Sequence, residues 1–554
     1  MRRIIPAMLL ATICGLASLP GASVALGTIE RVSVTSAELE ATGGDSLDTA
    51  VSDNGRFVAF ASDATDLVAG DTNGMTDIFV RDRADGTTER VSVNSAEEQA
   101  LAGDSERPAI SGDGRYVVFR SGATNLRAGD DVIARELYIR DRSAGTTEVV
   151  SFSDDEQDVG SGDYPDISAD GRYVVFESNS VPFPNPTALG RLDIFLRDRT
   201  AGTTELVNIS DSEEQASGGS WYPTISDDGN LVAFASSANN LSPDDAQIHS
   251  NIFLRNRSAG TTTLVDVNSA EEQADYQTGG AGPVISANGL FVAFISGATN
   301  LVPNDPDRYD VFVRDLAAGT TEMASVGSDE AAANSNSVTP AISASGRFVA
   351  WDSYASNLDP TDTYFSSDIF VRDRLLGTTE RVSITAVSGP GDNSFNPSIS
   401  ADGGVVAYES EATDLVSDDT NGNFDAFVHA YDLDFDGVAD WVDNCPTVAN
   451  TAGQLADVDG DLAGDACDAP GTGNADCNQV VNATDALKIL RYVAGLSVAQ
   501  SEPCKDVGQT IGSGFKQGDV DCSGAVLATD ALKILRRVAG LAAGTSCSGP
   551  IIGP

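Results

Sequence analysis

Short apolar stretches alternate with polar turns through most of this chain, and the pattern repeats with a nearly fixed period. One copy comprises Ile167–Phe176, Asp193–Arg199 and Ala201–Val207. Its brief apolar runs, bounded by glycine, aspartate and threonine, predict four short β-strands with three connections. Similar copies fill the chain from about residue 29 to about residue 430.

A glycine preceded by Asp or Asn separates the first two strands in six of the seven copies, and Ser345 is the exception. This dipeptide between apolar runs predicts a two-residue hairpin turn with positive φ at both central residues. The glycines lie 57 to 60 residues apart, and they are Gly55, Gly114, Gly171, Gly229, Gly289, Gly346 and Gly403.

The second strand, as in Arg56–Phe60 and Arg347–Trp351, is apolar on both faces, which is typical of a strand covered on two sides. The third strand resembles Asp77–Arg81. After a Gly-Thr-Thr turn, the fourth resembles Glu89–Val93. Four antiparallel strands repeated seven times predict a mainly β fold, a seven-bladed β-propeller.

The two ends of the repeat region predict that the ring is closed. The seventh copy stops after Asp425–Val428 and lacks a fourth strand, whereas Ile29–Val34 nearly duplicates Thr88–Val93. An N-terminal strand that completes the last blade would pair its open edge, whereas an open solenoid gives no reason for this arrangement.

The repeats resemble the TolB-like, PD40 family of WD40-like bacterial propellers over about residues 29–430. The matching motifs are Ser-x-Asp-Gly-Arg-Tyr/Phe-Val, Asp-Ile-Phe-Val-Arg-Asp and Gly-Thr-Thr-Glu. The resemblance implies the fold. It leaves function open, because such propellers serve as binding platforms and as enzyme scaffolds.

Alternating strand direction places all tight turns on one face of the ring, here named the tight-turn face. The long 2–3 loops and the blade-to-blade connections share the opposite, loop-rich face, where we expect any ligand site. That face is acidic, and its connections carry Glu38, Glu40, Glu97, Glu98, Asp154, Asp155, Glu156, Glu213, Glu214, Glu271, Glu272, Asp329 and Glu330.

Two interpretations of this acidity remain open. The acids form a ring for cations or a basic partner, or they are solvated loop tips and Asx turns. The Asp71–Asp77 and Asp419–Asp425 loops are candidates for metal, but they lack the acidic ligand at position twelve of a full calcium loop.

Catalytic patterns are scarce in this sequence. The chain has two histidines, His249 and His429, which fall in different copies. We find no Ser/His/Asp arrangement, zinc-ligand spacing or phosphate-binding glycine loop, so no catalytic or cofactor-binding residue is assigned. A carboxylate pair for glycoside cleavage stays possible, because acids are abundant.

The N-terminus predicts secretion. Arg2 and Arg3 precede an apolar run, Ile4–Leu19, and Ser23–Ala25 offers a small-x-small cleavage site, so residues 1–25 form a predicted signal peptide. Ile13 makes Cys14 a poor lipoprotein site. The net charge of −50 argues against nucleic-acid partners and membrane insertion and favours cations such as Ca²⁺.

A tandem acidic pattern follows the last repeat and predicts calcium binding. Acids at relative positions 1, 3, 5, 9 and 12 let a short loop surround one hard cation. The two copies carry Asp432, Asp434, Asp436, Asp440 and Asp443, then Asp457, Asp459, Asp461, Asp465 and Asp468. They resemble thrombospondin type 3 repeats, which implies Ca²⁺ at both and a Cys445–Cys467 disulfide. Leu462 departs from the usual glycine.

The C-terminal segment is a duplicate of one loop-and-helix unit, with Ala483–Arg491 matching Ala528–Arg536. Positions 1, 3, 5 and 12 of the loops carry Asn474, Asp476, Asn478 and Asp485, then Asp519, Asp521, Ser523 and Asp530. The pair resembles a type I dockerin, a small helical domain of paired half-EF-hands. The resemblance implies one Ca²⁺ per copy and docking to a cohesin. Gln479, Ala483 and Ala528 depart from the family pattern.

Cysteine usage agrees with an oxidising compartment. Six cysteines remain after residue 25, all in the last quarter, and an even count in a secreted chain predicts disulfides. Of the three pairings open to the last four, Cys477–Cys504 with Cys522–Cys547 is favoured, because each then closes its own unit.

The predicted organisation is a signal peptide (1–25), a propeller (28–431), thrombospondin type 3-like repeats (432–470) and a dockerin-like domain (471–548). We expect a secreted or cell-surface, calcium-binding, non-catalytic recognition and anchoring protein. It would be a monomer whose tail binds a cohesin-type or other surface protein and whose propeller binds, for example, a polysaccharide. The alternatives are an extracellular glycoside hydrolase or polysaccharide lyase, and a structural adhesion protein.

Overall fold

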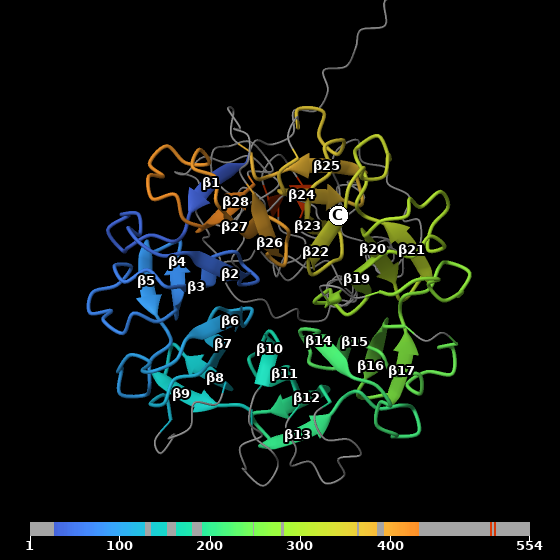
Figure 1. Ribbon diagram of the computed structural model, residues 1–554, viewed down its shortest axis with the longest axis horizontal. Helices are drawn as coiled ribbons and strands as arrows, with labels where there is room; N and C mark the ends of the chain where they lie inside the picture. Colours follow the sequence, from blue (N-terminus) through green and yellow to red (C-terminus); the bar gives the residue numbers. More distant parts are fainter. Residues whose placement is uncertain are drawn as a thin grey trace, which may run out of the picture.

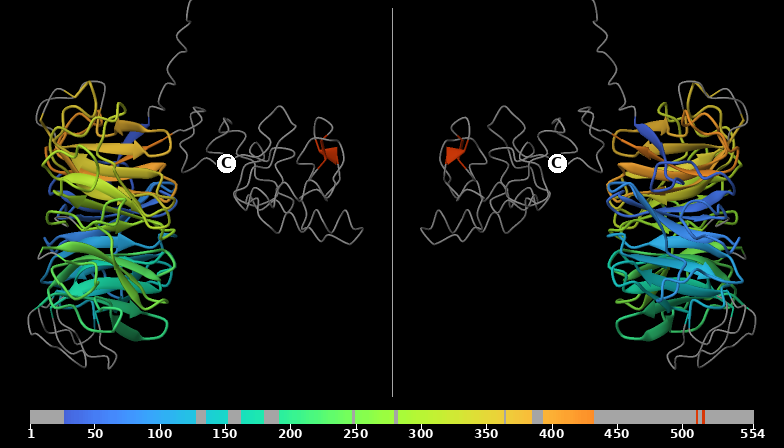
Figure 2. Two further views of the ribbon diagram at one scale, coloured as in Figure 1. Left: turned by 90° about the vertical axis from the view of Figure 1, so that its right-hand side faces the viewer. Right: turned by 90° about the vertical axis from the view of Figure 1, so that its left-hand side faces the viewer.

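The computed structural model describes residues 27–127, 135–151, 162–179, 191–246, 249–278, 282–362, 365–384, 393–431, 510–511 and 515–516. Within these residues, seven four-stranded antiparallel sheets stand around a common axis, as Figure 1 shows. Seen edge-on in Figure 2, they form a disc. The predicted seven-bladed β-propeller is confirmed.

Each blade runs from its innermost to its outermost strand in chain order. Blade 1 comprises β2 (Ser46–Val51), β3 (Phe57–Ser62), β4 (Asp77–Asp82) and β5 (Thr87–Arg90). Blade 2 comprises β6 (Ser105–Ile110), β7 (Tyr116–Ser121), β8 (Glu136–Asp141) and β9 (Thr146–Val149). Blade 3 comprises β10 (Gly162–Ile167), β11 (Tyr173–Ser178), β12 (Asp193–Asp198) and β13 (Thr203–Leu206).

The remaining blades follow the same order. Blade 4 comprises β14 (Ser220–Ile225), β15 (Leu231–Ser236), β16 (Asn251–Asn256) and β17 (Thr261–Leu264). Blade 5 comprises β18 (Val284–Ile285), β19 (Phe291–Ser296), β20 (Asp310–Asp315) and β21 (Thr320–Met323). Blade 6 comprises β22 (Ser337–Ile342), β23 (Phe348–Ser353), β24 (Asp368–Asp373) and β25 (Thr378–Arg381). Blade 7 comprises β26 (Ser394–Ile399), β27 (Val405–Ser410), β28 (Asp425–Ala430) and, from the N-terminus, β1 (Thr28–Arg31).

The core lies between neighbouring blades, which explains why the middle strands are apolar on both faces. In β3, Val58 and Phe60 pack with residues of blade 7, while Ala59 and Ala61 pack with residues of blade 2. Successive side chains of a strand point to opposite faces, so one strand supplies both interfaces.

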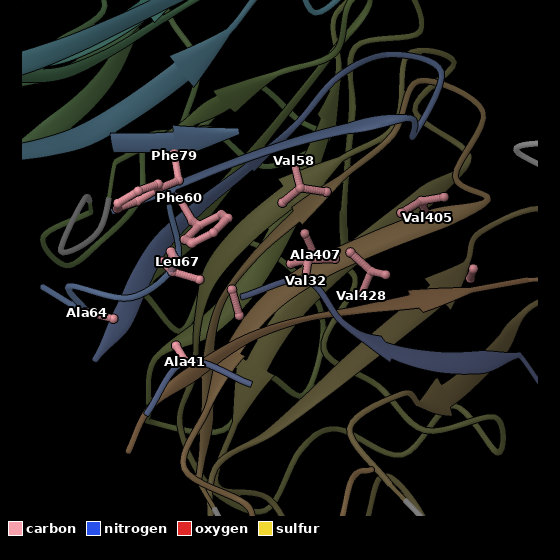
Figure 3. Packing of buried hydrophobic residues seen from close by; sticks show 12 residues of the cluster. Val32, Ala41, Val58, Phe60, Ala64, Leu67, Phe79, Val405, Ala407 and Val428 are labelled. Carbon is pink, nitrogen blue, oxygen red and sulfur yellow. The ribbon is translucent and has the colours of Figure 1, made fainter. Parts of the chain in front are cut away.

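The N-terminal strand closes the ring. β1 pairs antiparallel with β28, in a register that places Thr28 opposite Ala430 and Arg31 opposite Phe427. Val32, immediately after β1, is fully buried with Val58 of blade 1 and Val428 of blade 7, as Figure 3 shows. The predicted closure is therefore confirmed.

The predicted two-residue hairpin turns are wrong. β2 ends at Val51 and β3 begins at Phe57, so five residues connect them. Gly55 has a φ of 68°, whereas the preceding Asn54 is not in the left-handed region. The Gly55 N–H donates to the Ser52 carbonyl at 2.9 Å, and the Ser52 hydroxyl donates to Asn54 Oδ1 at 2.9 Å. One backbone bond and one side-chain bond thus stabilise a longer turn that needs only the glycine in that region.

The predicted tail falls almost wholly outside the described residues. All eighteen predicted calcium ligands, from Asp432 to Asp530, lie outside them, as do the signal peptide and the cysteines. Between the two predicted dockerin-like loops, β29 (Thr510–Ile511) pairs antiparallel with β30 (Phe515–Lys516). Among the described residues, no helix is long and apolar enough to cross a membrane.

Candidate functional site

The innermost strands carry a repeated backbone irregularity around the axis of the ring. In six of the seven blades, the register between the first and second strands shifts by a β-bulge. The residue in the bulge has a φ between 45° and 73°, and in six blades a proline follows it. We name these seven residues the axial belt, and they are Asp48, Arg107, Tyr164, Tyr222, Gly282, Thr339 and Asn396.

Neighbouring members of the axial belt contact one another across blade boundaries. The Arg107 guanidinium lies 3.7 Å from the centroid of the Tyr164 ring, and the Tyr164 and Tyr222 rings meet edge-on at 4.5 Å. The Arg107 N–H donates to Asp48 Oδ2 at 3.2 Å. Because the bulge re-aims each side chain, the belt presents polar and aromatic groups around the axis.

One position beside the belt departs from the repeat. The fifth residue of the second strand is aliphatic in blades 1, 4 and 5, where it is Ala61, Ala235 and Ile295. In the other four blades it is charged, and these residues are Arg120, Glu177, Asp352 and Glu409. All four are less than 8% exposed, which is rare for charged residues without a specific role. We name them the axial charges.

The three acidic axial charges titrate far from their usual range. Burial raises the pKa of Glu177, Asp352 and Glu409 to about 7 each. Their hydrogen bonds act in the opposite direction: the N–H of Tyr222 donates to Glu177 at 2.8 Å, and the N–H of Asp48 donates to Glu409 at 2.8 Å. Shifts of this kind are concentrated at functional sites in proteins.

The arginines of the site are joined by one carboxylate. Asp163 accepts from Arg107 at 2.8 Å and from Arg120 at 2.6 Å, and Glu106 also pairs with Arg120. The side chains of Arg107 and Asp163 remain 31% and 27% exposed, so a ligand can reach both.

Aromatic side chains gather on the same face. Phe395, the second residue of β26, lies 6.4 Å from the ring of Tyr354 and 6.3 Å from that of Phe424, measured between centroids. Tyr354 directly follows β23, and Phe424 directly precedes β28, so both come from 2–3 loops. The loop-rich face, where we expect any ligand site, therefore combines charges with aromatic rings.

The opposite end of the axis is bridged by backbone hydrogen bonds between turns. The Ala401 N–H donates to the Asp53 carbonyl at 2.9 Å, and the Asp53 N–H donates to Gly112 at 3.1 Å. The Gly112 N–H donates to the Ala169 carbonyl at 3.1 Å, and the Ala344 N–H donates to the Ala401 carbonyl at 2.9 Å. Direct bonds between adjacent turns hold them close together, which leaves the loop-rich face as the approach for a ligand.

The predicted acidic ring resolves into ion pairs. A glutamate with positive φ at the tip of each described connection reaches an arginine in the third strand of the next blade, at 2.5 to 2.9 Å. These arginines are at most 8% exposed in their side chains. The pairs are Glu38–Arg81, Glu97–Arg140, Glu213–Arg255, Glu271–Arg314 and Glu330–Arg372. These glutamates bind neighbouring blades together.

Arginine also occupies the two candidate metal loops. Arg90 Nη1 lies 3.0 Å from Asp71 and 3.2 Å from Asp77. In blade 7, Arg31 Nη1 lies within 4 Å of Glu40, Asp419 and Asp425, the one group of three acids in the described residues with a spacing suited to a metal. A guanidinium already supplies the positive charge in both loops, so we place no metal there.

The two histidines lie apart in the ring. His249 precedes β16 in blade 4, and His429 lies within β28 in blade 7, so they are in different blades as predicted. Burial lowers the pKa of His429 to about 4, which keeps it neutral at physiological pH.

Comparisons with known proteins describe the architecture only. A scan against protein families finds no match to this chain, and a search of curated proteins finds none. Among solved structures, TolB from Acinetobacter baumannii is 14% identical with a TM-score of 0.35, and the match covers 59% of this chain and 63% of that one. The chain thus matches less than two thirds of that TolB.

Two further solved structures cover most of their own length. Oligogalacturonate lyase from Vibrio parahaemolyticus is 12% identical with a TM-score of 0.46, covering 73% of this chain and 93% of that one. The β-propeller domain of the Trilobed protease from Pyrococcus furiosus is 12% identical with a TM-score of 0.43, covering 72% and 96%. At these identities and TM-scores, the likenesses say nothing of what this chain binds.

Proposed function

We propose that this protein is a secreted, non-catalytic recognition and anchoring protein whose propeller binds a glycan over the axial belt. The observation that carries the proposal is the break in the repeat. In four blades, the fifth residue of the second strand is a buried charged residue in place of an aliphatic one, and this position lies next to the loop-rich face. Aliphatic residues fill this position in the other three blades, so the repeat also accepts an uncharged residue there.

The chemistry of the site suits a sugar. A pyranose ring presents apolar C–H faces, which pack on aromatic rings, and hydroxyl edges, which bond to carboxylates and guanidinium groups. Tyr164, Tyr222 and Phe395 supply rings, while Arg107 and Asp163 supply exposed charged partners. A polysaccharide would also be long enough to contact several blades.

Binding is favoured over catalysis because each acidic axial charge already serves the backbone or a neighbouring side chain. Glu177 and Glu409 accept backbone N–H groups of the following blade, and Asp352 lies 3.5 Å from the Ser367 hydroxyl. The three acids come from blades 3, 6 and 7, and burial lowers the pKa of His429 to about 4, which makes it a weak base. A polysaccharide-degrading enzyme is the rival that the experiment below separates.

The anchoring half of the proposal rests on the sequence of the tail. The thrombospondin-like ligands from Asp432 to Asp468 and the dockerin-like ligands from Asn474 to Asp530 would hold Ca²⁺. The dockerin-like domain would then dock to a cohesin-type or other surface protein. Removal of calcium with a chelator should release the full-length protein from that partner.

The glycan proposal is tested by screening the full-length protein on neutral and acidic polysaccharides and measuring the best binder by calorimetry. Arg107→Ala removes an exposed charge. Tyr222→Gly removes a ring at a position where Gly282 shows that glycine fits the backbone. Each variant should raise the dissociation constant about tenfold or more, equivalent to about 1.4 kcal/mol.

Leu290→Ala is the matched control, because Leu290 is 46% exposed in a tight turn on the opposite face. Its affinity should equal that of the wild-type protein. Equal affinity of all three variants would refute the site, and release of reducing or unsaturated sugar products would establish the enzyme instead.

A further inference from the structure

Three blades share a motif in which one arginine neutralises two buried aspartates. The first aspartate lies in the 2–3 loop, the second begins the third strand, and the arginine lies in the fourth strand. In blade 1, Arg90 Nη1 lies 3.0 Å from Asp71 and 3.2 Å from Asp77. A serine hydroxyl, that of Ser92, donates to the other oxygen of Asp77 at 2.6 Å.

Blades 6 and 7 repeat this arrangement. Arg381 Nη1 lies 3.5 Å from Asp362 and 3.2 Å from Asp368. In blade 7 the corresponding separations from Arg31 to Asp419 and Asp425 are 3.8 and 3.7 Å. A single positive charge thus fits between the two carboxylates at the same place in three blades.

Blade 5 keeps both aspartates and lacks the arginine. Its loop aspartate is Asp305, and β20 begins with Asp310. Strand register places Met323 opposite Phe312, as Arg90 is opposite Phe79, so Met323 occupies the arginine position.

The glutamine that assists in other blades is also missing from blade 5. Gln273 of the connection after blade 4 donates to Asp245 at 2.9 Å, and it forms a bridge with Val267. In the connection after blade 5, the residue in the equivalent bridge is Ala332, opposite Val326. Both groups that could balance the acids are therefore replaced by apolar residues.

Three of the four carboxylate oxygens of Asp305 and Asp310 consequently lack a hydrogen-bond partner among the described residues. Asp310 is fully buried; its Oδ1 accepts from the Ser325 hydroxyl at 2.8 Å, but its Oδ2 has no hydrogen-bond partner among the described residues. Both carboxylate oxygens of Asp305 are buried, and neither has a hydrogen-bond partner among the described residues. In blades 1, 6 and 7 it is the equivalent Oδ2 that faces the arginine.

Electrostatics agrees with this geometry. Burial raises the pKa of Asp305 and of Asp310 to about 7 each, and the two charges repel one another at Asp305. Arg308 lies close enough to oppose the shift at Asp310, and its Nη1 donates to the Ala333 carbonyl at 3.3 Å. Two buried carboxylates without a counter-ion are costly.

A cavity gives access to this place. It has a volume of about 710 Å³, lies between blades 5 and 6, and is lined by Asn304, Met323 and Ala332 among others. Asn304 is the residue before Asp305, and Met323 and Ala332 are the two apolar replacements. The cavity thus adjoins the pair, although neither Asp305 nor Asp310 lines it.

We propose that Asp305 and Asp310 bind a calcium ion at the position that arginine occupies in blades 1, 6 and 7. Hard divalent cations prefer carboxylate oxygens, and water from the cavity completes the coordination. With only two protein carboxylates, we expect a dissociation constant of about 10⁻⁴ to 10⁻³ M, the range of extracellular modules. This site is separate from the glycan site and from the calcium loops proposed in the tail.

The chain itself supplies the variants that test the site. Met323→Arg restores the arginine of blades 1, 6 and 7 and should fill the site with its guanidinium. Met323→Leu is the control, because leucine stands at the same position in blades 3 and 4 as Leu206 and Leu264. Equilibrium dialysis of the full-length proteins against radioactive calcium counts the bound ions.

The Met323→Arg protein should bind one calcium fewer than the wild-type protein, and Met323→Leu should bind the same number. The Asp305→Asn variant removes one carboxylate of the site without adding an arginine. It should also bind one calcium ion fewer than the wild-type protein. An unchanged number in both Met323→Arg and Asp305→Asn would show that protons alone neutralise the pair and would overturn the proposal. The tail contributes equally to every variant, so its own calcium content does not affect this difference.

Discussion

In blade 4, a buried carboxylate and its amide partner stand in each other's positions compared with blade 3. Asp266 is fully buried, and its carboxylate accepts from the Ile252 N–H at 3.1 Å. Its equivalents in blades 1 and 3 are Ser92 and Asn208, which donate to Asp77 and Asp193, whereas blade 4 has Asn251 in place of that aspartate. The acid and the amide have exchanged places, and burial raises the pKa of Asp266 to about 8.

We predict that Asp266→Asn stabilises the propeller at alkaline pH. A carboxyl whose folded pKa is raised stabilises the fold below its unfolded pKa of about 4, and this contribution is lost as pH rises through about 8. The Asp266→Asn variant has no ionisable group at this position, so its free energy of unfolding does not fall for this reason. Its free energy of unfolding should match the wild-type value near pH 4 and exceed it by a few kcal/mol at pH 8.5.

Denaturant unfolding of both proteins across this pH range checks the prediction. A difference that stays constant with pH would contradict it, because a purely structural effect of the substitution would not titrate.

The ion-pair partners of individual charged side chains were the hardest part of the site to predict. The sequence left the acidic connections open between a cation ring and solvated loop tips, because it shows charge without its partner. Their arginines lie 42 or 43 residues further along, as in Glu97 and Arg140, and that recurring offset was the available signal. The axial charges were also visible as a break at one position of the aligned copies, but the bulges that assemble the belt depend on register between strands.

At the scale of the element, β1 is the strand on which ring closure depends. It covers the edge of β28, and the buried Val32 joins blade 7 to blade 1. Val91 is the equivalent residue in blade 1, where it follows the fourth strand directly and is 1% exposed. If β1 is a full member of its blade, the two valines should matter equally.

We predict that Val32→Ala and Val91→Ala each lower the free energy of unfolding by about 1–3 kcal/mol, since each leaves a small cavity in an interblade core. Calorimetric melting of the two variants makes the comparison. No effect of Val32→Ala beside a clear effect of Val91→Ala would mean that the N-terminal strand is dispensable.

Elements were predictable from sequence to the extent that they repeat. The number of blades and the closing strand followed from seven similar copies and one displaced piece. Fourth strands were placed about two residues too late, as with the predicted Glu89–Val93 and the observed Thr87–Arg90, because the apolar Val91 continues the pattern past the strand. Its N–H still bonds to the Ile78 carbonyl at 2.8 Å.

Across the whole molecule, charge is arranged in concentric positions around the axis. Glutamate–arginine pairs bind neighbouring blades at the five described connections, and Arg115–Asp141 and Arg172–Asp198 pairs tie strands within blades at 2.6 Å. Hydrogen bonds from these arginines lower the pKa of Asp141 and Asp198 to about 2. Their contribution to stability is present above the unfolded pKa of about 4 and is lost only as pH falls through about 2.

The innermost charges behave in the opposite way. Glu177 and Glu409, with pKa values raised to about 7, stabilise the fold only below their unfolded pKa of about 4.3, and that contribution disappears as pH rises through about 7. At neutral pH these residues therefore weaken the propeller. We propose that they are kept for ligand binding at the expense of stability.

The double variant Glu177→Gln, Glu409→Gln provides the test, because glutamine keeps one oxygen acceptor at each position and removes the charge. Melting temperature and glycan affinity would be measured on the same preparation at pH 8. The account predicts a higher melting temperature than that of the wild-type protein together with affinity reduced about tenfold or more. A variant that binds glycan as well as the wild-type protein, or that melts at a lower temperature, would contradict it.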